Sequence, residues 1–259
     1  MAASPTMQLD LDLGNTRIKW RLSACQSTLK SDQQSACVTG VAFYDEGILT
    51  AVANVTNQSG VKIGRVRIAC VAGPERLEKV IAQCRHLCRR EPELARVIRE
   101  CAGVRAGYRD LSHLGVDRWL GLLAAYQHYQ SGCVVVGCGT AVTVDLVDAM
   151  GQHLGGYIVP GFELMRGALY SNTNAVRIEQ LQAPDDLSPG DDTAPAVNKG
   201  LLLMIKALVD NACARLQQDQ TAVATVLTGG DAPLLQAFFN GQCDYNEHLV
   251  LDGLAVALP

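Results

Sequence analysis

The chain has 259 residues, of which 48% are hydrophobic and 19% charged, so it can bury a large core in one large domain or two smaller ones. Its formal net charge of −4 at pH 7 does not indicate the excess positive charge that nucleic-acid binding requires. No apolar run is long enough to cross a membrane. Residues 1–6 have neither the basic region nor the apolar core of a signal peptide, so we expect a cytoplasmic protein that binds neither nucleic acid nor membrane.

The first predicted element is a β-hairpin. In residues 9–13, leucine alternates with Asp10 and Asp12, which is the period of a strand that buries one face and presents carboxylates on the other. A glycine-containing turn at residues 14–16 follows, and an apolar alternation resumes at residues 18–20. Because a Gly-Asn pair tolerates positive φ, this pattern predicts a hairpin with the turn at its tip.

The tip of this hairpin suits an anion. Backbone N–H groups of a tight glycine turn, with the Thr16 hydroxyl and the Lys19 ammonium nearby, match nucleotide phosphates. Asp12 at the strand end matches a hydrated Mg²⁺. The alternative is an ordinary hairpin with solvated acids, since short motifs also match by chance.

A strand and a helix follow a poorly patterned stretch. Residues 41–43 form a candidate strand, and residues 66–72 predict a longer one. Gly73 and Pro74 then open a helix whose apolar residues recur at helical spacing. These residues therefore predict a βα unit.

The cysteines do not predict a metal site. Ten are scattered along the chain without a C-x-x-C pair. On the helix after Pro74, Cys84 and Cys88 share one face and His86 points away from it, so the three side chains cannot converge on one ion.

A second helix is predicted to start at Asp117, because the sequence becomes apolar directly after it, through residues 119–126. Aspartate is a favourable N-cap. A purely structural role for Asp117 is therefore the alternative to any chemical one.

The middle of the chain repeats the first hairpin. Residues 133–136 predict an apolar strand, a glycine turn follows at Gly139, and β-branched residues then alternate. Gly139 lies 125 residues after Gly14, and the same offset aligns Asp12 with Gly137. A recurrence at about half the chain length predicts two similar halves that face each other, each with one phosphate-handling turn and a nucleotide between them.

The last third of the chain predicts further strands and helices. A glycine turn at residues 228–231 either brings the backbone close to a ligand or simply joins a strand to a helix. The predicted elements are a strand at 154–161, a helix at 163–170 with Leu164, Ala168 and Leu169 inward, a loop at 182–193, a helix at 197–217 with Leu201, Ile205, Leu208, Ala212 and Leu216 buried, a strand at 223–227 and a helix at 232–239.

With these segments in order, the chain resembles the type III pantothenate kinase family, which includes the Bvg accessory factor of Bordetella. The resemblance implies an α/β fold of the duplicated actin-like and sugar-kinase-like (ribonuclease H-like) kind, with two halves, 1–115 and 116–259, around a nucleotide cleft. The matching segments are residues 12–16, Tyr108 with residues 115–119, residues 139–143, residues 155–161, Asp192-Thr193, and residues 228–230.

The activity that the resemblance implies is ATP-dependent phosphorylation of pantothenate to 4′-phosphopantothenate, the first step of coenzyme A biosynthesis. It implies a homodimer that uses ATP, Mg²⁺ and K⁺ or NH₄⁺. The alternative is a nucleotide-binding regulatory accessory protein on the same fold without significant turnover. The chain has Asp12, Asp117, Arg118 and Thr140 of the family pattern, and their presence weighs against a protein without turnover.

The resemblance also assigns roles to single residues. Asp117 would be the catalytic base, and Asp12 would hold Mg²⁺, directly or through water. Arg118 could bind the pantothenate carboxylate with two hydrogen bonds. The implied ATP-binding residues are Asp12, Leu13, Gly14, Asn15, Thr16, Arg17, Ile18, Lys19 and Thr140, and those for pantothenate are Tyr108, Gly115, Val116, Asp117, Arg118 and Thr193.

Two positions depart from the family pattern. Gly137 stands where the family commonly has the acid associated with a monovalent cation, which puts the K⁺ or NH₄⁺ site in doubt, and Asp145 on the adjoining strand is the first substitute to consider. Leu111 stands where proline is usual, which removes a constraint on the loop that carries Tyr108.

Overall fold

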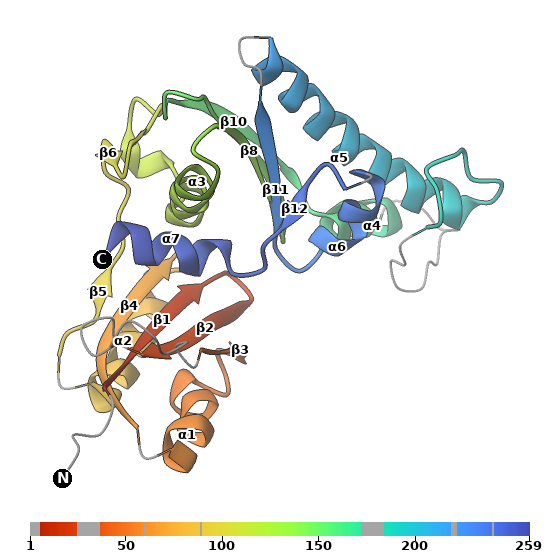
Figure 1. Cartoon of the computed structure of the whole chain (residues 1–259). Helices are drawn as coiled ribbons and strands as arrows, with labels where there is room; N and C mark the ends of the chain where they lie inside the picture. The colour runs from red at the N-terminus through yellow and green to blue at the C-terminus, as the bar shows by residue number, and fades with distance from the viewer. Residues whose placement is uncertain are drawn as a thin grey trace. The chain divides into compact units, whose positions relative to one another are not determined.

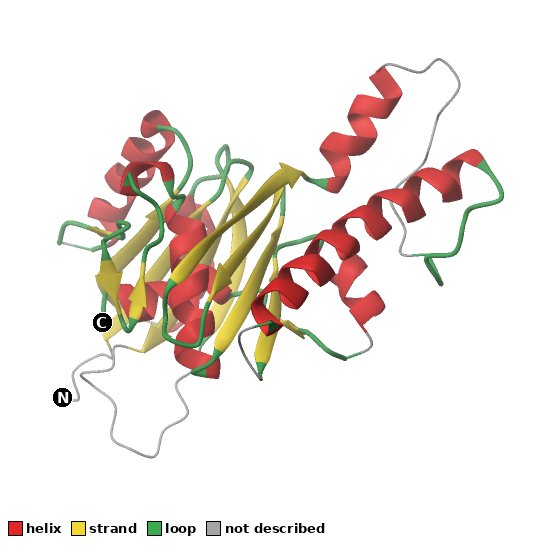
Figure 2. Cartoon of the chain, turned by 90° about the horizontal axis from the view of Figure 1, so that it is seen from above, coloured by secondary structure: helices red, strands yellow, loops and turns green. Residues whose placement is uncertain are grey.

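The computed structural model describes residues 6–24, 37–59, 61–88, 90–171, 184–218, 222–239 and 241–259. They form two compact units, and Figure 1 labels most of their helices and strands. Unit 1 comprises residues up to Val97, Ser112–Leu120 and Val250–Pro259, and unit 2 comprises Ile98–Leu111 and Gly121–Leu249. In Figure 2, strands and helices are distinguished by colour, and each unit contains both.

Unit 1 contains a mixed sheet in the order β3-β2-β1-β4-β5. β1 and β2 form the predicted hairpin, with Leu13 opposite Ile18, and β4 runs parallel to β1. The elements are β1 (Thr6–Leu13), β2 (Arg17–Ala24), β3 (Val38–Phe43), α1 (Ile48–Ser59), β4 (Lys62–Cys70), α2 (Pro74–Leu87), β5 (Glu93–Leu94), the start of α3 (Val116–Tyr129) and most of α7 (Leu249–Ala257).

Unit 2 contains a second mixed sheet, in the order β10-β9-β8-β11-β12. The rest of α3 belongs to this unit. The other elements are β6 (Glu100–Cys101), β7 (Val104–Arg105), β8 (Gly132–Cys138), β9 (Ala141–Val147), β10 (His153–Pro160), α4 (Phe162–Ser171), α5 (Thr193–Gln217), β11 (Val223–Thr228), α6 (Ala232–Gln236) and β12 (Asp244–Tyr245).

The two five-stranded sheets, both built from described residues, have the same topology. In each, the first strand pairs antiparallel with the second and parallel with the fourth, and the second pairs antiparallel with the third. Cys138 lies opposite Val142 as Leu13 lies opposite Ile18. Cys138 is 125 residues after Leu13, so the duplication predicted from the hairpin spacing is confirmed.

The apolar face of the unit 1 sheet packs as the alternation predicts. Leu9, Leu11 and Leu13 are fully buried in one cluster with Ile48 and Val52 of α1 and with Val80 and Cys84 of α2. Burying a leucine contributes about 1.5–3 kcal/mol, so this face contributes substantially to the stability of unit 1.

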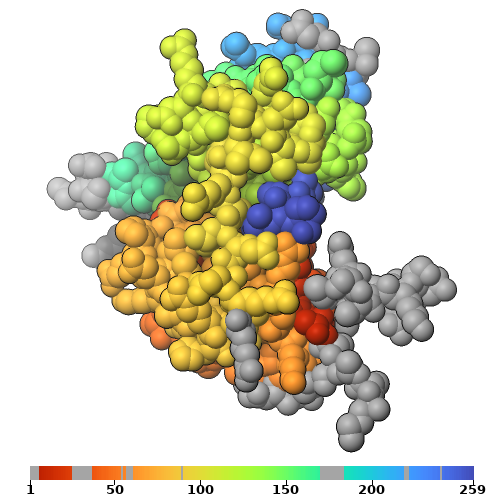
Figure 3. All heavy atoms as spheres, turned by 90° about the vertical axis from the view of Figure 1, so that its left-hand side faces the viewer, coloured from red at the N-terminus to blue at the C-terminus, as the bar shows by residue number. Residues whose placement is uncertain are grey.

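The opposite face of that sheet is not solvated, so the expectation that it shows free carboxylates is wrong for Asp10. Asp10 is 0% exposed, and its carboxylate accepts hydrogen bonds from Arg67 Nε at 2.8 Å and Arg21 Nε at 3.3 Å. Both arginines also donate to carbonyl groups of the C-terminal segment, at Leu258 and Leu251. Thus α7, dark blue against the orange surface of unit 1 in Figure 3, covers this face.

The predicted inward face of the helix at 163–170 is also wrong. Leu164, Ala168 and Leu169 are exposed, whereas Phe162 and Arg166 are buried. Since α4 begins at Phe162, the i and i+4 positions that follow this aromatic anchor set the buried face.

The helix predicted at 197–217 is confirmed, although α5 begins earlier, at Thr193. Its fully buried residues are Leu202, Ile205, Val209, Ala212 and Leu216, with Leu201 and Leu208 partly buried beside them. Among the described residues, no helix is long and apolar enough to cross a membrane.

Candidate active site

The tip of the first hairpin is an exposed turn. Gly14 N donates to Arg17 O at 3.2 Å, and Asn15, Thr16 and Arg17 are exposed. Gly14 is not in the left-handed region, so its role here is spatial: a Cβ at this position would lie 3.3 Å from Arg17 O. The turn therefore keeps its backbone accessible without backbone strain.

Two side chains that the sequence reasoning missed hold this turn. Tyr44 Oη donates to Gly14 O at 2.6 Å, and Arg76 Nη1 donates to Asn15 O. The Arg76 guanidinium lies 4.6 Å from the centre of the Tyr44 ring. Burial raises the pKa of Tyr44 to about 12, so its hydroxyl stays a donor at neutral pH. These contacts join segments about 30 and 60 residues apart, so no local pattern could signal them.

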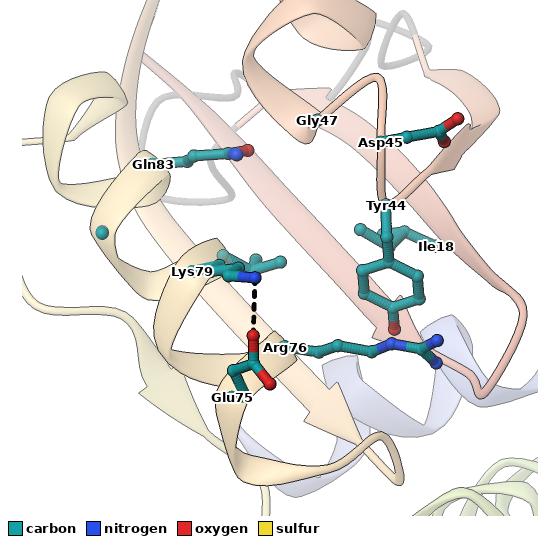
Figure 4. A pocket seen from close by; sticks show the side chains of 10 residues that line it. Ile18, Tyr44, Asp45, Gly47, Glu75, Arg76, Lys79 and Gln83 are labelled. Carbon is teal, nitrogen blue, oxygen red and sulfur yellow. Dashed lines mark hydrogen bonds and ion pairs between the residues drawn. The ribbon is translucent and has the colours of Figure 1, made fainter.

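Tyr44 and Arg76 also line a pocket of about 470 Å³, drawn in Figure 4. Lys79 and Glu75 pair with each other at its edge, at 2.7 Å. Gln83 Oε1 accepts from Ile48 N at 2.9 Å, which ties α2 to the start of α1.

Asp12 is the titratable group most altered by its surroundings near the hairpin. Its pKa is raised to about 7, mainly by loss of water around the carboxylate and next by the charge of Asp117, while Lys19 and Arg17 act in the opposite direction. Two carboxylates that the sequence places 105 residues apart therefore interact in unit 1. A pKa near 7 leaves Asp12 poised to bind a cation or a proton.

Asp117 lies one residue inside the helix that it was predicted to start. Trp119 N donates to Gly115 O at 3.0 Å, so Gly115 occupies the cap position, and the predicted N-cap role of Asp117 is wrong. Its Oδ1 accepts from Arg118 N at 2.8 Å. A Cβ on Gly115 would lie 2.6 Å from that oxygen, so glycine leaves room for this carboxylate.

Arg118, adjacent to Asp117, is only 8% exposed, which excludes its interpretation as a solvated surface arginine. A guanidinium in such a setting needs a hydrogen-bonding or anionic partner. Burial therefore distinguishes Arg118 from the arginines of the solvated surface.

In unit 2, Tyr108 is held by His153, a third residue that the sequence reasoning missed. The two rings are stacked, with centres 5.7 Å apart. Gly107 N donates to His153 Nδ1 at 3.4 Å, so the ring proton is on Nε2, which donates to Asp145 Oδ1 at 3.2 Å. Tyr108 O also accepts from Arg99 Nη1 at 2.9 Å, so the loop is fixed without the usual proline.

The second hairpin carries Thr140 at its exposed tip. Gly161 N donates to Thr140 O at 2.9 Å, and a Cβ on Gly161 would lie only 2.1 Å from Gly139 O. Thr193, which was predicted together with Tyr108 to bind pantothenate, is the exposed first residue of α5.

The glycine turn after β11 has a structural explanation. Gly229 has φ +100°, and its Cβ would lie 2.1 Å from Cys138 O. The turn therefore needs glycine to approach the neighbouring strand, which favours the plain strand-to-helix interpretation over a ligand.

The described residues contain no cluster of three or more His, Cys, Asp or Glu side chains that could hold a metal ion by themselves. Mg²⁺ usually keeps several waters and binds one or two protein carboxylates together with substrate phosphates. Asp12, with Asp117 nearby, provides a donor set of that kind.

Comparison with known proteins gives consistent results. A family model described as type III pantothenate kinase matches residues 8–215. A protein of that name from Ectopseudomonas mendocina is 38% identical over 257 residues, covering 98% of this chain and 99% of the relative. Another from Pseudomonas aeruginosa is 37% identical over 260 residues, with the same coverage.

Two solved structures share the fold. A Campylobacter jejuni protein assigned to the Baf family of transcriptional activators superimposes with a TM-score of 0.58 and 20% identity, covering 95% of both chains. A protein described as a 2-dehydro-3-deoxygalactonokinase from Sinorhizobium meliloti gives a TM-score of 0.54 and 14% identity, covering 96% of this chain and 95% of that one. Each likeness shows a shared fold.

Proposed function

The chain belongs to the type III pantothenate kinase family, which phosphorylates pantothenate with ATP in coenzyme A biosynthesis and uses a divalent metal, and from this premise we propose which residues carry the reaction. The observation that carries the proposal is that the buried carboxyl group of Asp12, near the end of β1, has a raised pKa to which the charge of Asp117, in the first turn of α3, contributes. Phosphoryl transfer depends mainly on alignment and charge neutralisation, with one carboxylate to receive the hydroxyl proton.

Residues 12–19 and Thr140 bind ATP in this proposal. The exposed first turn and the charges of Lys19 and Arg17 support it. Asp12 would hold Mg²⁺, directly or through water, and the metal would neutralise phosphate charge when bound. The raised pKa of Asp12 supports this role, because a cation would offset the repulsion from Asp117.

Asp117 accepts the proton of the pantothenate hydroxyl. Its carboxylate is oriented by the hydrogen bond from Arg118 N and by the space at Gly115. The buried guanidinium of Arg118 binds the pantothenate carboxylate, and Tyr108, Val116 and Thr193 complete the proposed pantothenate set.

The test of this function is a coupled ADP-release assay with purified protein, ATP and pantothenate, with a panel of sugars and other hydroxy acids as controls. We expect ADP release with ATP and pantothenate, and none with ATP and any of the control compounds. ATP binding without turnover would instead support a regulatory accessory protein on the same fold, and turnover with a sugar would support another kinase of the same fold.

Because ATP is consumed in the reaction, we propose a cytoplasmic location.

We also propose that the chain is organised as two actin-like halves, 1–115 and 116–259. The repeated sheet topology and the 125-residue offset support this division.

We expect weaker binding of a monovalent cation than in relatives that have an acid at position 137. Gly137 offers no side-chain oxygen, and Asp145 is already bonded to buried His153. We expect the unaltered protein either to depend less on K⁺ or NH₄⁺ than relatives with an acid there or to need higher concentrations, and we expect Gly137→Asp to sharpen the response. Gly137 is not left-handed, but its Cβ would lie 2.8 Å from Thr143 Oγ1, so Thr143 must shift.

The measurement is activity against KCl at constant ionic strength, in a Tris background, for both proteins. Thermal unfolding of Gly137→Asp serves as the control for the crowding at Thr143. Saturable activation of the unaltered protein at low millimolar K⁺ would contradict the prediction.

We propose a homodimer in which α5 contributes to the contact. Large apolar side chains are exposed on three elements of unit 2, which favours burial against a second copy. They are Leu154 and Ile158 of β10, Leu164 and Leu169 of α4, and Leu203 and Met204 of α5.

Light scattering should give a dimer at working concentration. Met204→Glu, at a position 51% exposed, should shift it toward monomer, because the charge would be desolvated at the contact. Met150→Glu, at a position 86% exposed in the β9–β10 turn, is the matched control and should leave the dimer intact. A fully active monomer would overturn the proposal.

A further inference from the structure

We infer that Tyr44 and Arg76 are positioning residues for the ATP-binding turn, setting the direction of its backbone amides. The inference deepens the proposed function, because it rests on the turn at residues 14–16 binding phosphate. Both side chains come from unit 1 and lie outside the residues that family resemblance assigns to ATP.

The geometry follows from two consecutive peptide groups. The Tyr44 hydroxyl binds the carbonyl of Gly14, and the Arg76 guanidinium binds the carbonyl of Asn15. In a planar trans peptide, the C=O and N–H groups point in opposite directions, and the described residues contain no cis bond. Holding both carbonyls toward Tyr44 and Arg76 therefore turns the N–H groups of Asn15 and Thr16 away from them.

The two positioning side chains, Tyr44 and Arg76, which we call the anchors of the turn, contact each other. The Arg76 guanidinium lies 4.6 Å from the centre of the Tyr44 ring, in cation–π contact, so each side chain limits the rotation of the other. Figure 4 shows the Tyr44 hydroxyl pointing toward the Arg76 guanidinium. A phosphate on the amide side of the turn would then meet donors that are already oriented, which lowers the entropy lost on binding.

The second half of the chain has an equivalent arrangement. Phe43 lies opposite Arg17, and Pro160 lies opposite Ala141, so Tyr44 and Gly161 both directly follow the third strand of their sheets. Gly161 N donates to Thr140 O at 2.9 Å. In each half, the residue after the third strand thus binds a carbonyl of the hairpin tip, through a side chain in one and the backbone in the other.

The first test compares Tyr44→Phe with the unaltered chain. This change removes the donor to Gly14 O and keeps the ring beneath Arg76. We expect the KM for ATP, and the Kd of a non-hydrolysable ATP analogue, to rise roughly two- to tenfold, the effect of one net hydrogen bond. The KM for pantothenate at saturating ATP should not change.

Further variants separate positioning from stability and from charge. Arg76→Met should act in the same direction as Tyr44→Phe, and the double variant should lose less than the product of the two effects, because both anchors hold one turn. Lys79→Met is the matched control, since Lys79 is an exposed cation on the same helix that pairs with Glu75 rather than with the hairpin. It should leave both KM values unchanged.

An unchanged Kd for the ATP analogue in Tyr44→Phe would overturn the inference, whether or not thermal stability falls. An equal loss in Lys79→Met would also overturn it, because that result would assign the effect to pocket charge. Failure of the unaltered chain to phosphorylate pantothenate would instead overturn the proposed function, and the comparison of analogue binding would still test the anchors.

Discussion

Replacing Asp117 by Asn is expected to lower the kcat for pantothenate phosphorylation by about 10²- to 10⁴-fold, the usual contribution of a general base. Asparagine keeps the size of the side chain, and its Oδ1 can still accept the bond from Arg118 N, which measures 2.8 Å in the structure. The fold and ATP binding should therefore persist. The measurement is steady-state ADP release, together with thermal unfolding and binding of an ATP analogue.

The same variant should change the pH dependence of Mg²⁺-dependent ATP binding. Asp12 has a pKa of about 7, so it becomes protonated, and loses its attraction for a cation, as the pH falls through 7. The charge of Asp117 is one cause of that raised pKa, so removing it should move the loss of binding to lower pH.

Asp45→Asn is the matched control for Asp117→Asn, because Asp45 is an exposed acid of the same unit with no proposed role. It should keep full turnover. Near-normal turnover of Asp117→Asn, with a small loss of stability, would show that Asp117 only stabilises the first turn of α3.

Replacing Asp10 by Asn is expected to destabilise the fold by about 3–5 kcal/mol, the usual effect of removing one partner of a buried ion pair. The carboxylate is 0% exposed, and Arg67, 4% exposed, would be left with its charge buried and unpaired. This is a large share of a typical stability of about 5–15 kcal/mol. Urea unfolding measures it directly.

Asp252→Asn is the control, since this acid also pairs with Arg21 but is 40% exposed. Its loss should cost about 0–1 kcal/mol, because water screens an exposed pair. Equal effects of the two substitutions would show that burial of Asp10 is not what makes its ion pair important.

Single strands, turns and helix starts could be predicted from the sequence, because neighbouring residues in the chain determine them. The leucine alternation and the glycine turn predict the β1–β2 hairpin, and Gly73-Pro74 predicts the start of α2. The recurrence of the strand–turn–strand pattern after 125 residues predicts the repeated sheet, because such a repeat can be seen in the sequence without knowing how the strands pack. The motifs at residues 12–16 and 115–119 indicate the family that the comparisons establish.

The partners of each face depend on tertiary structure. A period of two separates the faces of β1, but it does not say that the C-terminal segment, about 240 residues later, supplies carbonyl partners for the arginines of Asp10. In the same way, helical spacing predicted Leu164, Ala168 and Leu169 as the buried face of α4, whereas Phe162 and Arg166 are the buried residues.

The site shows the same division. The sequence by itself determined that Asp12 lies near the end of a strand before a glycine turn and that Asp117 lies near the start of an apolar helix. Only the tertiary structure decided that Asp117 raises the pKa of Asp12, that Tyr44 and Arg76 hold the turn, and that His153 stacks on Tyr108. The physical reason is that local patterns reflect backbone geometry and solvent exposure, whereas pairing and pKa depend on distances between segments far apart in the chain.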